Sequence, residues 1–306
     1  MKTSRSEALR AENVLPAPQP ALDLEALRGE LSALDLHFAS ANLSDQLTTA
    51  VKENWGPPVF LERLLSIELE RREERRIRVG LKLSGLPTGQ TITNFDFAFQ
   101  PAVERSKIEA LATCTWLKEK QSLLILGPAG VGKTHLAVAL GVKAIECGFS
   151  VVFYRLDELL HALRKDAEIS PTRLRGKKYM NTALVIVDEM GFQPLTRAEA
   201  NLLFRMVSHR YQRGSLCLTS NKGIKDWPEM LAGDEALAMA ILDRLLHASH
   251  VLNIRGRSYR LRDLEDTLKR EGQAPLQRQT AAAATTEATA EAKGAHPPAV
   301  AESRPA

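Results

Sequence analysis

The 306-residue sequence lacks several features that would place it in a specialised class of protein. It contains no run of about eighteen apolar residues, so we expect no membrane-spanning segment and no membrane partner. Its first residues have neither an apolar stretch nor a small-residue cleavage site, so they do not predict a secretory signal. The 3 cysteines, Cys114, Cys147 and Cys217, lie far apart in apolar segments without metal-ligand spacing. We therefore expect reduced core thiols in a cytoplasmic protein.

Aromatic residues are also scarce, at 5%, and neither sign of charge dominates strongly. The net charge of +4 and the pI near 9.0 are compatible with nucleic-acid binding but also occur in many proteins that bind none. Apolar residues at 44% and charged residues at 25% are ordinary for a globular chain. Composition thus indicates a folded protein and leaves its partners open.

Both ends of the chain are poor in large apolar residues. Residues 1–22 are polar and contain prolines, while residues 271–306 are rich in alanine and threonine. Such segments cannot bury enough apolar surface to offset the chain entropy that folding removes. The sequence therefore predicts two disordered tails, and we assign no function to either.

Residues 23–86 carry apolar side chains at the three- and four-residue spacing of helices, which predicts a small helical domain. Within it lies a charged cluster, which consists of Arg71, Arg72, Arg75, Arg76, Arg78 and Lys82 interleaved with Glu68, Glu70, Glu73 and Glu74. The cluster is either a solvated helix face with ion pairs between successive turns or a patch that follows nucleic-acid phosphates. The sequence leaves both interpretations open.

Residues 87–270 have a different sequence pattern, which predicts a helix from about 108 to 120 followed by short apolar strands that alternate with helices. We expect strands at 122–127, 150–155, 183–189, 215–221 and 250–254. We expect helices at 132–147, 156–164, 196–212, 235–247 and 259–270. Strands built almost wholly from Val, Ile and Leu and separated by helices predict an α/β core, with a parallel sheet covered on both faces.

The segment GPAGVGKTH, residues 127–135, follows the first predicted strand and matches the phosphate-loop pattern G-x-x-x-x-G-K-[ST]. Its glycines allow backbone conformations that point N–H groups at phosphate, and the following helix presents its positive end. Lys133 supplies charge toward the β and γ phosphates, and the Thr134 hydroxyl is suited to Mg²⁺. The residues predicted to bind the nucleotide are Gly127, Pro128, Ala129, Gly130, Val131, Gly132, Lys133, Thr134 and His135.

Two further predicted strands end in polar residues, at the edge where α/β sheets bind ligands. ALVIVDE ends in Asp188 and Glu189, and SLCLTSN ends in Asn221. We predict that Asp188 holds Mg²⁺ through water and that Glu189 polarises the water that attacks the γ-phosphate. Asn221 is predicted to hydrogen-bond that water or the γ-phosphate.

The order of these motifs resembles that of the AAA+ ATPases. LTSNKGIKDW (218–227), ALAMAILDRLLHASH (236–250) and GRSYRLRD (256–263) are similar to the insertion-sequence helper ATPases of the IstB type, close relatives of the DnaC helicase loader. The resemblance covers roughly residues 25–270. It implies an AAA+ P-loop NTPase core, preceded by a small helical domain that binds DNA or a partner, and it implies ATP and Mg²⁺ as cofactors.

The resemblance also implies roles for single arginines. Arg244, in LDRL, matches the arginine finger, which reaches the γ-phosphate held by a neighbouring subunit. Arg260, in SYRL, matches the second sensor, which contacts nucleotide, and Asn221 matches the first sensor. Taken alone, Arg244 would be read as a side chain that snorkels from an amphipathic helix and pairs with Asp243. If Arg244 is the arginine finger, the active site is completed between subunits of an ATP-dependent homo-oligomer.

The function implied is that of an ATP-dependent transposition helper. It would assemble on duplex DNA, prepare that DNA for the transposase of the same insertion element, regulate the transposase, and hydrolyse ATP to disassemble. The arginines on and after the helix at 196–212 either line a DNA-facing surface or are exposed helix charges with no specific role; they are Arg197, Arg205, Arg210 and Arg213. The alternative is a replicative helicase loader of the DnaC type. A peptide remodeller is disfavoured, because no aromatic-Val-Gly loop follows the first strands.

Overall fold

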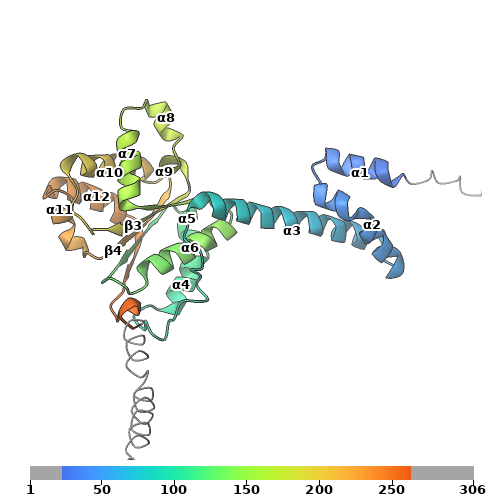
Figure 1. Cartoon of the computed structure of the whole chain (residues 1–306), viewed down its shortest axis with the longest axis horizontal. Helices are drawn as coiled ribbons and strands as arrows, with labels where there is room; N and C mark the ends of the chain where they lie inside the picture. The colour runs from blue at the N-terminus through green and yellow to red at the C-terminus, as the bar shows by residue number, and fades with distance from the viewer. Residues whose placement is uncertain (1–22, 263–306) are drawn as a thin grey trace, which may run out of the picture. The chain divides into compact units, whose positions relative to one another are not determined.

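The computed structural model describes residues 23–262, and these fall into two units, residues 23–79 and 80–262 (Figure 1). The predicted tails, and residues 263–270 of the helix expected at 259–270, lie outside the described residues. Among the helices that are described, none combines the length and the apolar character needed to cross a membrane.

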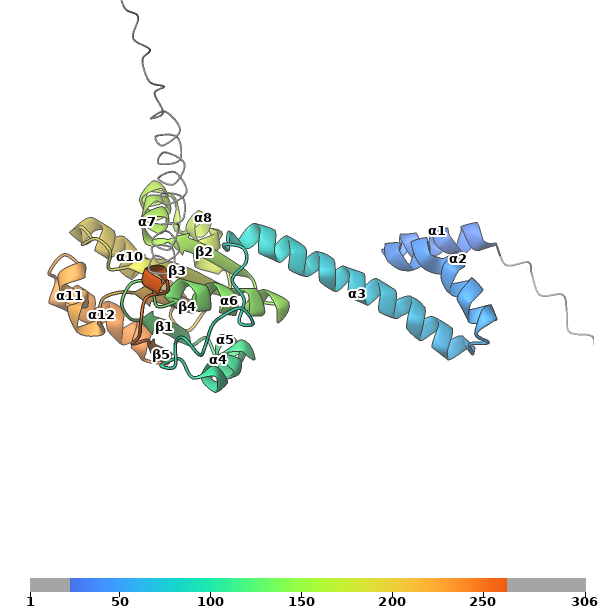
Figure 2. The ribbon, with the colours of Figure 1, turned by 60° about the horizontal axis from the view of Figure 1, so that its bottom comes forward.

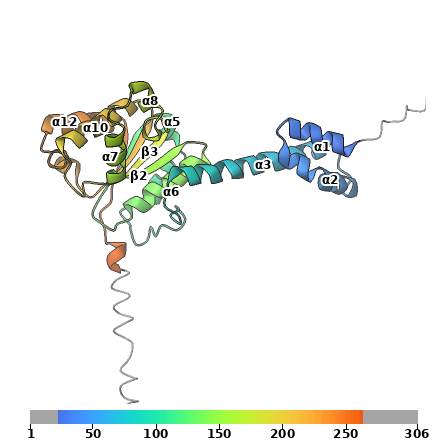
Figure 3. The ribbon, with the colours of Figure 1, turned by 45° about the horizontal axis from the view of Figure 1, so that its top comes forward.

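The amino-terminal unit is helical, as the sequence predicts. Its described part contains α1 (Leu24–Ala33), α2 (His37–Lys52) and most of α3 (Pro57–Ser84). Figure 3 shows α1 and α2 beside the amino-terminal half of α3. Their shared core consists of Ala39, Leu43 and Leu64, surrounded by Leu27, Leu31, Leu36, Leu47 and Phe60.

Helix α2 receives its amino-terminal cap from a distant residue. Leu36 occupies the N-cap position and makes no side-chain cap bond. The carboxylate of Glu68, on α3, instead accepts the N–H groups of Phe38 at 2.7 Å and Ala39 at 2.9 Å. Glu68 is only 2% exposed and also pairs with Arg72 at 2.8 Å. Burial alone would raise the pKa of Glu68, but the Ala39 N–H and the Arg72 side chain outweigh it and lower that pKa.

Replacing Glu68 by alanine is therefore expected to loosen the junction of α2 and α3. The change removes a cap and leaves two N–H groups in α2 without an acceptor, at a cost of about 1–2 kcal/mol in local stability. Because the pKa of Glu68 is lowered on folding, its contribution is present above the ordinary value of 4.5 and is lost as the pH falls through the folded value. Faster amide hydrogen exchange at Phe38 and Ala39 would report the loss.

Glu73→Gln is a matched control on the same helix, because the exposed Glu73 pairs only with Arg76 among the described residues. Unchanged exchange in Glu68→Ala would contradict the capping role.

The remaining ion pairs of the charged cluster join Arg71 to Glu74 at 2.9 Å and Arg76 to Glu73, both across one turn. Part of the cluster is thus an ion-paired helix face, as the first interpretation expects.

The second unit contains the predicted parallel sheet. Its strands are β1 (Ser122–Leu126), β2 (Val151–Arg155), β3 (Leu184–Met190), β4 (Ser215–Ser220) and β5 (Ser249–Asn253). Every neighbouring pair is parallel, in the order β2-β3-β4-β1-β5, so β4 lies at the centre, between β3 and β1. The first and last residues of all five strands lie within one residue of the positions predicted from the sequence. This agreement confirms the α/β fold class.

Helices cover both faces of this sheet, as Figures 1 and 2 show. On one face α6 (Lys133–Glu146) packs against the strands, and on the other lie α7 (Leu156–Lys165), α10 (Arg197–Arg210) and α12 (Glu235–Leu246). Helix α6 comes close because of Gly141, where an added Cβ would lie 2.7 Å from Cδ1 of Ile186. Shorter elements fill the connections: α8 (Pro171–Arg175), α9 (Lys178–Asn181), a 3-10 turn (Ile224–Asp226) and α11 (Trp227–Met230).

The helix expected at about 108–120 is divided in two, and the break brings two cysteines together. Cys114 lies between α4 (Arg105–Ala112) and α5 (Thr115–Lys118) in the left-handed region, at φ 61°. Cys114 and Cys217 are buried, as predicted, but Cys147 is exposed and is not a core thiol. Burial raises the pKa of Cys114 to about 12, and the Cys147 thiol beside it adds to this rise.

Arg210 is not part of a DNA-facing surface, which corrects the suggestion from the sequence. It is 1% exposed and donates to four backbone carbonyls, those of Tyr179, Met180, Ala183 and Ser215. These carbonyls lie on α9 and at the amino ends of β3 and β4. The guanidinium therefore ties this end of the sheet together, while burial lowers its pKa to about 10.

Candidate active site

The phosphate loop joins β1 to α6, as the sequence predicts. Gly130 and Gly132 have φ values of 80° and 95°, which other residues rarely adopt. Helix α6 begins at Lys133, directly after Gly132, so the amino end of a 14-residue helix points into the loop. Free N–H groups at such an end attract anions. The Lys133 ammonium donates to the carbonyl of Pro128 at 2.7 Å and thus lies across the loop.

Two other segments hold this loop in place. A Cβ at Gly132 would lie 2.7 Å from the ring of Phe95, and one at Gly130 would lie 2.0 Å from the Ser258 hydroxyl. The N–H of Tyr259 also donates to the carbonyl of Gly130 at 2.9 Å. Any side chain at Gly130 or Gly132 would therefore displace the loop or its neighbours.

A buried carboxylate lies beside the start of α6. Asp188, near the end of β3, is 3% exposed and accepts the Thr134 hydroxyl, with O–O distances of 2.9 and 3.0 Å. The Thr219 hydroxyl, on β4, donates to the same carboxylate. A hydroxyl and a carboxylate in contact offer the oxygen ligands that Mg²⁺ prefers, and Mg²⁺ usually completes its shell with water and substrate phosphates. Thr134 and Asp188 therefore fit the predicted metal.

Glu189 follows Asp188 in an unusual conformation. The pairing of β3 with β4 shifts register between Val187 and Met190, and Glu189 lies in this irregularity at φ 64°. A non-glycine residue there costs about 1–2 kcal/mol. Its N–H donates to the Thr219 hydroxyl at 3.1 Å. Bulges of this kind change the direction of a side chain, and here the neighbours Asp188 and Glu189 differ: one is buried, the other is exposed in a cavity.

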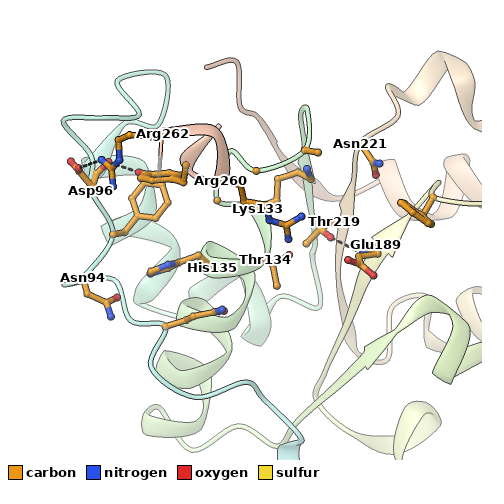
Figure 4. Close-up of a pocket in the computed structure, with 17 residues that line it drawn as sticks. Asn94, Asp96, Lys133, Thr134, His135, Glu189, Thr219, Asn221, Arg260 and Arg262 are labelled. Carbon is orange, nitrogen blue, oxygen red and sulfur yellow. Dashed lines mark hydrogen bonds and ion pairs between the residues drawn. The ribbon is translucent and has the colours of Figure 1, made fainter. Parts of the chain in front are cut away.

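That cavity, of about 480 Å³, contains most of the predicted site (Figure 4). Nine predicted residues line it: Ala129, Gly130, Gly132, Lys133, Thr134, His135, Glu189, Asn221 and Arg260. Five other predicted residues do not line the cavity. Gly127, Pro128 and Val131 belong to the phosphate loop but not to the lining, and Asp188 lies behind Thr134. The fifth residue is Arg244. Residues from the phosphate loop and from the ends of β3 and β4 thus meet in one place.

Lys133 and Arg260 favour an anion in their part of the cavity. Burial lowers the pKa of Lys133, the Asp188 carboxylate opposes this change, and the Arg260 guanidinium lowers the pKa further. Figure 4 shows Arg260 beside Lys133. Because two cations face one space, a polyanion such as a triphosphate would reduce their mutual repulsion.

The opposite side of the cavity, which we call the linker end, is lined by Gln90, Asn94, Phe95, His135 and Tyr259. Of these only His135 was predicted as a site residue from the sequence. The ring of Phe95 contacts those of His135 and Tyr259 at centroid distances of 5.3 and 6.1 Å. Asn94 and Phe95 lie in TITNFDF (91–97), a segment that also resembles the family but in which no single residue could be assigned to the base, and Tyr259 lies in GRSYRLRD. Thr219 was also missed, although it lies two positions before Asn221, on the same side of β4.

Arg244 lies elsewhere. It is half-buried near the end of α12, donates to the carbonyl of Ala240 at 2.7 Å, and places its guanidinium 4.9 Å from the ring centroid of Phe204. It lines a second cavity with Lys120 and Ser122, at the start of β1. The phosphate loop follows the other end of β1, roughly 16 Å away for a five-residue strand. Arg244 is thus on the surface but remote from its own chain's phosphate loop.

Comparisons with known proteins find relatives that are named as ATP-binding proteins. Residues 29–267 match the family model of the IstB-like ATP binding protein. The chain is 42% identical to the ATP-binding protein of insertion sequence IS21 from Pseudomonas aeruginosa, over 79% of this chain and 89% of that protein. It is 40% identical to the corresponding protein of IS5376 from Geobacillus stearothermophilus, over 67% and 81%.

Among solved structures, the DnaC helicase loader is 21% identical and covers 49% of this chain and 87% of its own, with a TM-score of 0.41. The assignment does not depend on this weaker likeness. The family match includes the phosphate loop, both acidic residues and α12, and it extends into the amino-terminal helices. The chain belongs to the IstB-like family of insertion-sequence ATP-binding proteins.

Proposed function

We propose that the protein is a cytoplasmic, Mg²⁺-dependent ATPase that assembles on duplex DNA and prepares it for the transposase of its own insertion element. ATP binding would favour assembly, and hydrolysis would favour disassembly. Membership of a family of insertion-sequence ATP-binding proteins supports ATP binding and a link to transposition. The DNA, the transposase and its regulation are our inference.

The observation that carries the ATPase proposal is the meeting of Lys133, the Thr134–Asp188 pair and Glu189 at one cavity. Lys133 would bind the terminal phosphates, and Thr134 and Asp188 would hold Mg²⁺, which supplies charge stabilisation when bound. The Glu189 carboxylate would accept a proton from the attacking water, while Asn221 would orient that water. Arg260 would bind the nucleotide from the carboxyl-terminal side.

The position of Arg244 supports an active site shared between subunits. The side chain is partly exposed and lies at the end of the sheet away from its own phosphate loop. If it serves as an arginine finger, it must therefore act on a nucleotide that another subunit binds. We propose that neighbouring subunits contact one another so that each cavity receives Arg244 from the next chain.

Two basic regions would contact DNA phosphates. In the charged cluster, Arg75 and Arg78 are exposed and form no salt bridge with another described residue. In the core, Arg173 and Arg175 on α8 and Lys178 on α9 are exposed within a few positions of one another. Contacts of this kind attract DNA with little regard to its sequence.

Affinity for duplex DNA in the presence of an ATP analogue should fall steeply with added salt and barely change with DNA sequence. Replacing Arg75 and Arg78 together by glutamine should weaken binding. It should also lower by about two the number of counterions released on binding, which is measured as the slope of log affinity against log salt concentration. Fluorescence anisotropy with duplexes of unrelated sequence measures both quantities. Glu70→Gln, in the same helix, is the control. Absent or salt-insensitive binding would refute the DNA proposal.

We favour a transposition helper over a helicase loader because the family match begins at residue 29 and so includes most of the amino-terminal helices. The two classes share their core motifs, so a difference is expected mainly in this unit. Co-purification of the protein with its transposase, and not with a replicative helicase, would support the choice.

A further inference from the structure

The linker end of the cavity contains one amide whose hydrogen-bonding capacity is not fully used. Gln90 lines the cavity, yet its Oε1 is buried and has no hydrogen-bond partner among residues 23–262. Leaving a buried acceptor unpaired costs about 1–3 kcal/mol. Such atoms are rare in folded proteins, and each calls for a physical explanation.

The polar neighbours of Gln90 are already engaged. Asn94 accepts the N–H of Thr91 at 2.8 Å and donates to the carbonyl of Gly89 at 2.5 Å, so it closes the loop on both sides of Gln90. His135 contacts the carbonyl of Thr91 through Nε2 at 2.8 Å. These contacts fix the backbone around Gln90 and leave its side chain as the group able to change partner.

The cavity also determines which part of a nucleotide this side chain would meet. Lys133 and Thr134 lie at the phosphate side, and His135 follows them on α6 toward the linker end. The rings of Phe95, His135 and Tyr259 make that end more apolar. A nucleotide with its phosphates at Lys133 would thus direct its base to the linker end, where apolar rings suit a flat heterocycle.

We propose that Gln90 is the residue that selects adenine over guanine. A carboxamide offers one acceptor and one donor side by side, which matches the exocyclic amino group of adenine and its ring nitrogen N7. Guanine presents two acceptors on the same edge, its carbonyl oxygen and N7, so the Gln90 oxygen would meet an acceptor in either orientation of the amide. Contact with the adenine amino group would satisfy the unpaired Oε1. This inference rests on the proposed function only in that the cavity binds ATP.

The test measures binding rather than turnover, with the full-length protein and non-hydrolysable analogues of ATP and GTP. The unmodified protein should bind the ATP analogue more tightly. Gln90→Met keeps the side chain's length and removes its hydrogen bonds, so affinity for the ATP analogue should fall about tenfold while affinity for the GTP analogue stays nearly constant. Gln90→Lys offers donors only and should move the preference further toward guanine.

Gln193→Met is the matched control, because Gln193 is exposed and does not line this cavity. Equal binding of the two analogues by the unmodified protein, or an equal loss of both in Gln90→Met, would overturn the selection role and leave ATP binding intact. Lys133→Ala should lower the affinity for both analogues to the same extent. If neither analogue binds to the unmodified protein, the proposed ATPase and the selection role both fail.

Discussion

Replacing Glu189 by glutamine is expected to leave ATP bound and to slow its hydrolysis at least about a hundredfold, a loss of roughly 2.7 kcal/mol in barrier height. Glutamine keeps the size of the side chain but cannot accept the proton of the attacking water. The backbone at Glu189 is already bent to φ 64° and held by Thr219, so the substitution should not alter the bulge. Single-turnover hydrolysis and nucleotide affinity, measured on the same preparation, separate the two effects.

Asp188→Asn is a useful comparison, since Asp188 contacts Thr134 rather than the cavity. It should raise the Mg²⁺ concentration needed for activity, whereas Glu189→Gln should not. Normal turnover in Glu189→Gln would show that another group activates the water. A loss of ATP affinity equal to the loss of turnover would instead assign Glu189 to binding.

Replacing Arg244 by alanine is expected to reduce turnover by at least about a thousandfold, the usual effect of losing an arginine finger. ATP affinity should change little, because this side chain lies away from its own chain's cavity. Mixing Arg244→Ala with Glu189→Gln should restore part of the activity. In such mixed assemblies some interfaces combine the intact Glu189 of one chain with the intact Arg244 of the next.

Recovery should be greatest near equal amounts of the two variants and should vanish when both changes are placed in one chain. Arg197→Ala is the control, because Arg197 is an exposed arginine on α10 that pairs with Asp234. Failure of every mixture to regain activity would reject action across an interface. Arg244 would then be explained by its contacts with Phe204 and the Ala240 carbonyl.

The regular part of the core was predictable because its signals are local. Each strand is a short apolar run between helical patterns, and polar residues at the ends of β3 and β4 must meet beside the phosphate loop when the strands are parallel. The cavity therefore contains Lys133, Glu189 and Asn221, as predicted from spacing. Arg260, taken from family resemblance, lines the same cavity.

What the sequence did not reveal depends on contacts between distant residues. Glu68 looked like one more charge on a solvated helix, but it caps a helix 29 positions earlier. Arg210 looked like an exposed arginine, but backbone carbonyls from α9, β3 and β4 surround it. Gln90 has no distinguishing neighbour in the sequence, and only the folded loop shows that its amide oxygen is unpaired.

The most direct test of the shared active site is ATP turnover per subunit as a function of protein concentration, with and without duplex DNA. If one chain supplies the phosphate loop and Glu189 and the next supplies Arg244, turnover per subunit should rise steeply as assembly begins, and DNA should shift that rise to lower concentration. Full turnover per subunit at concentrations where the protein is monomeric would contradict the account.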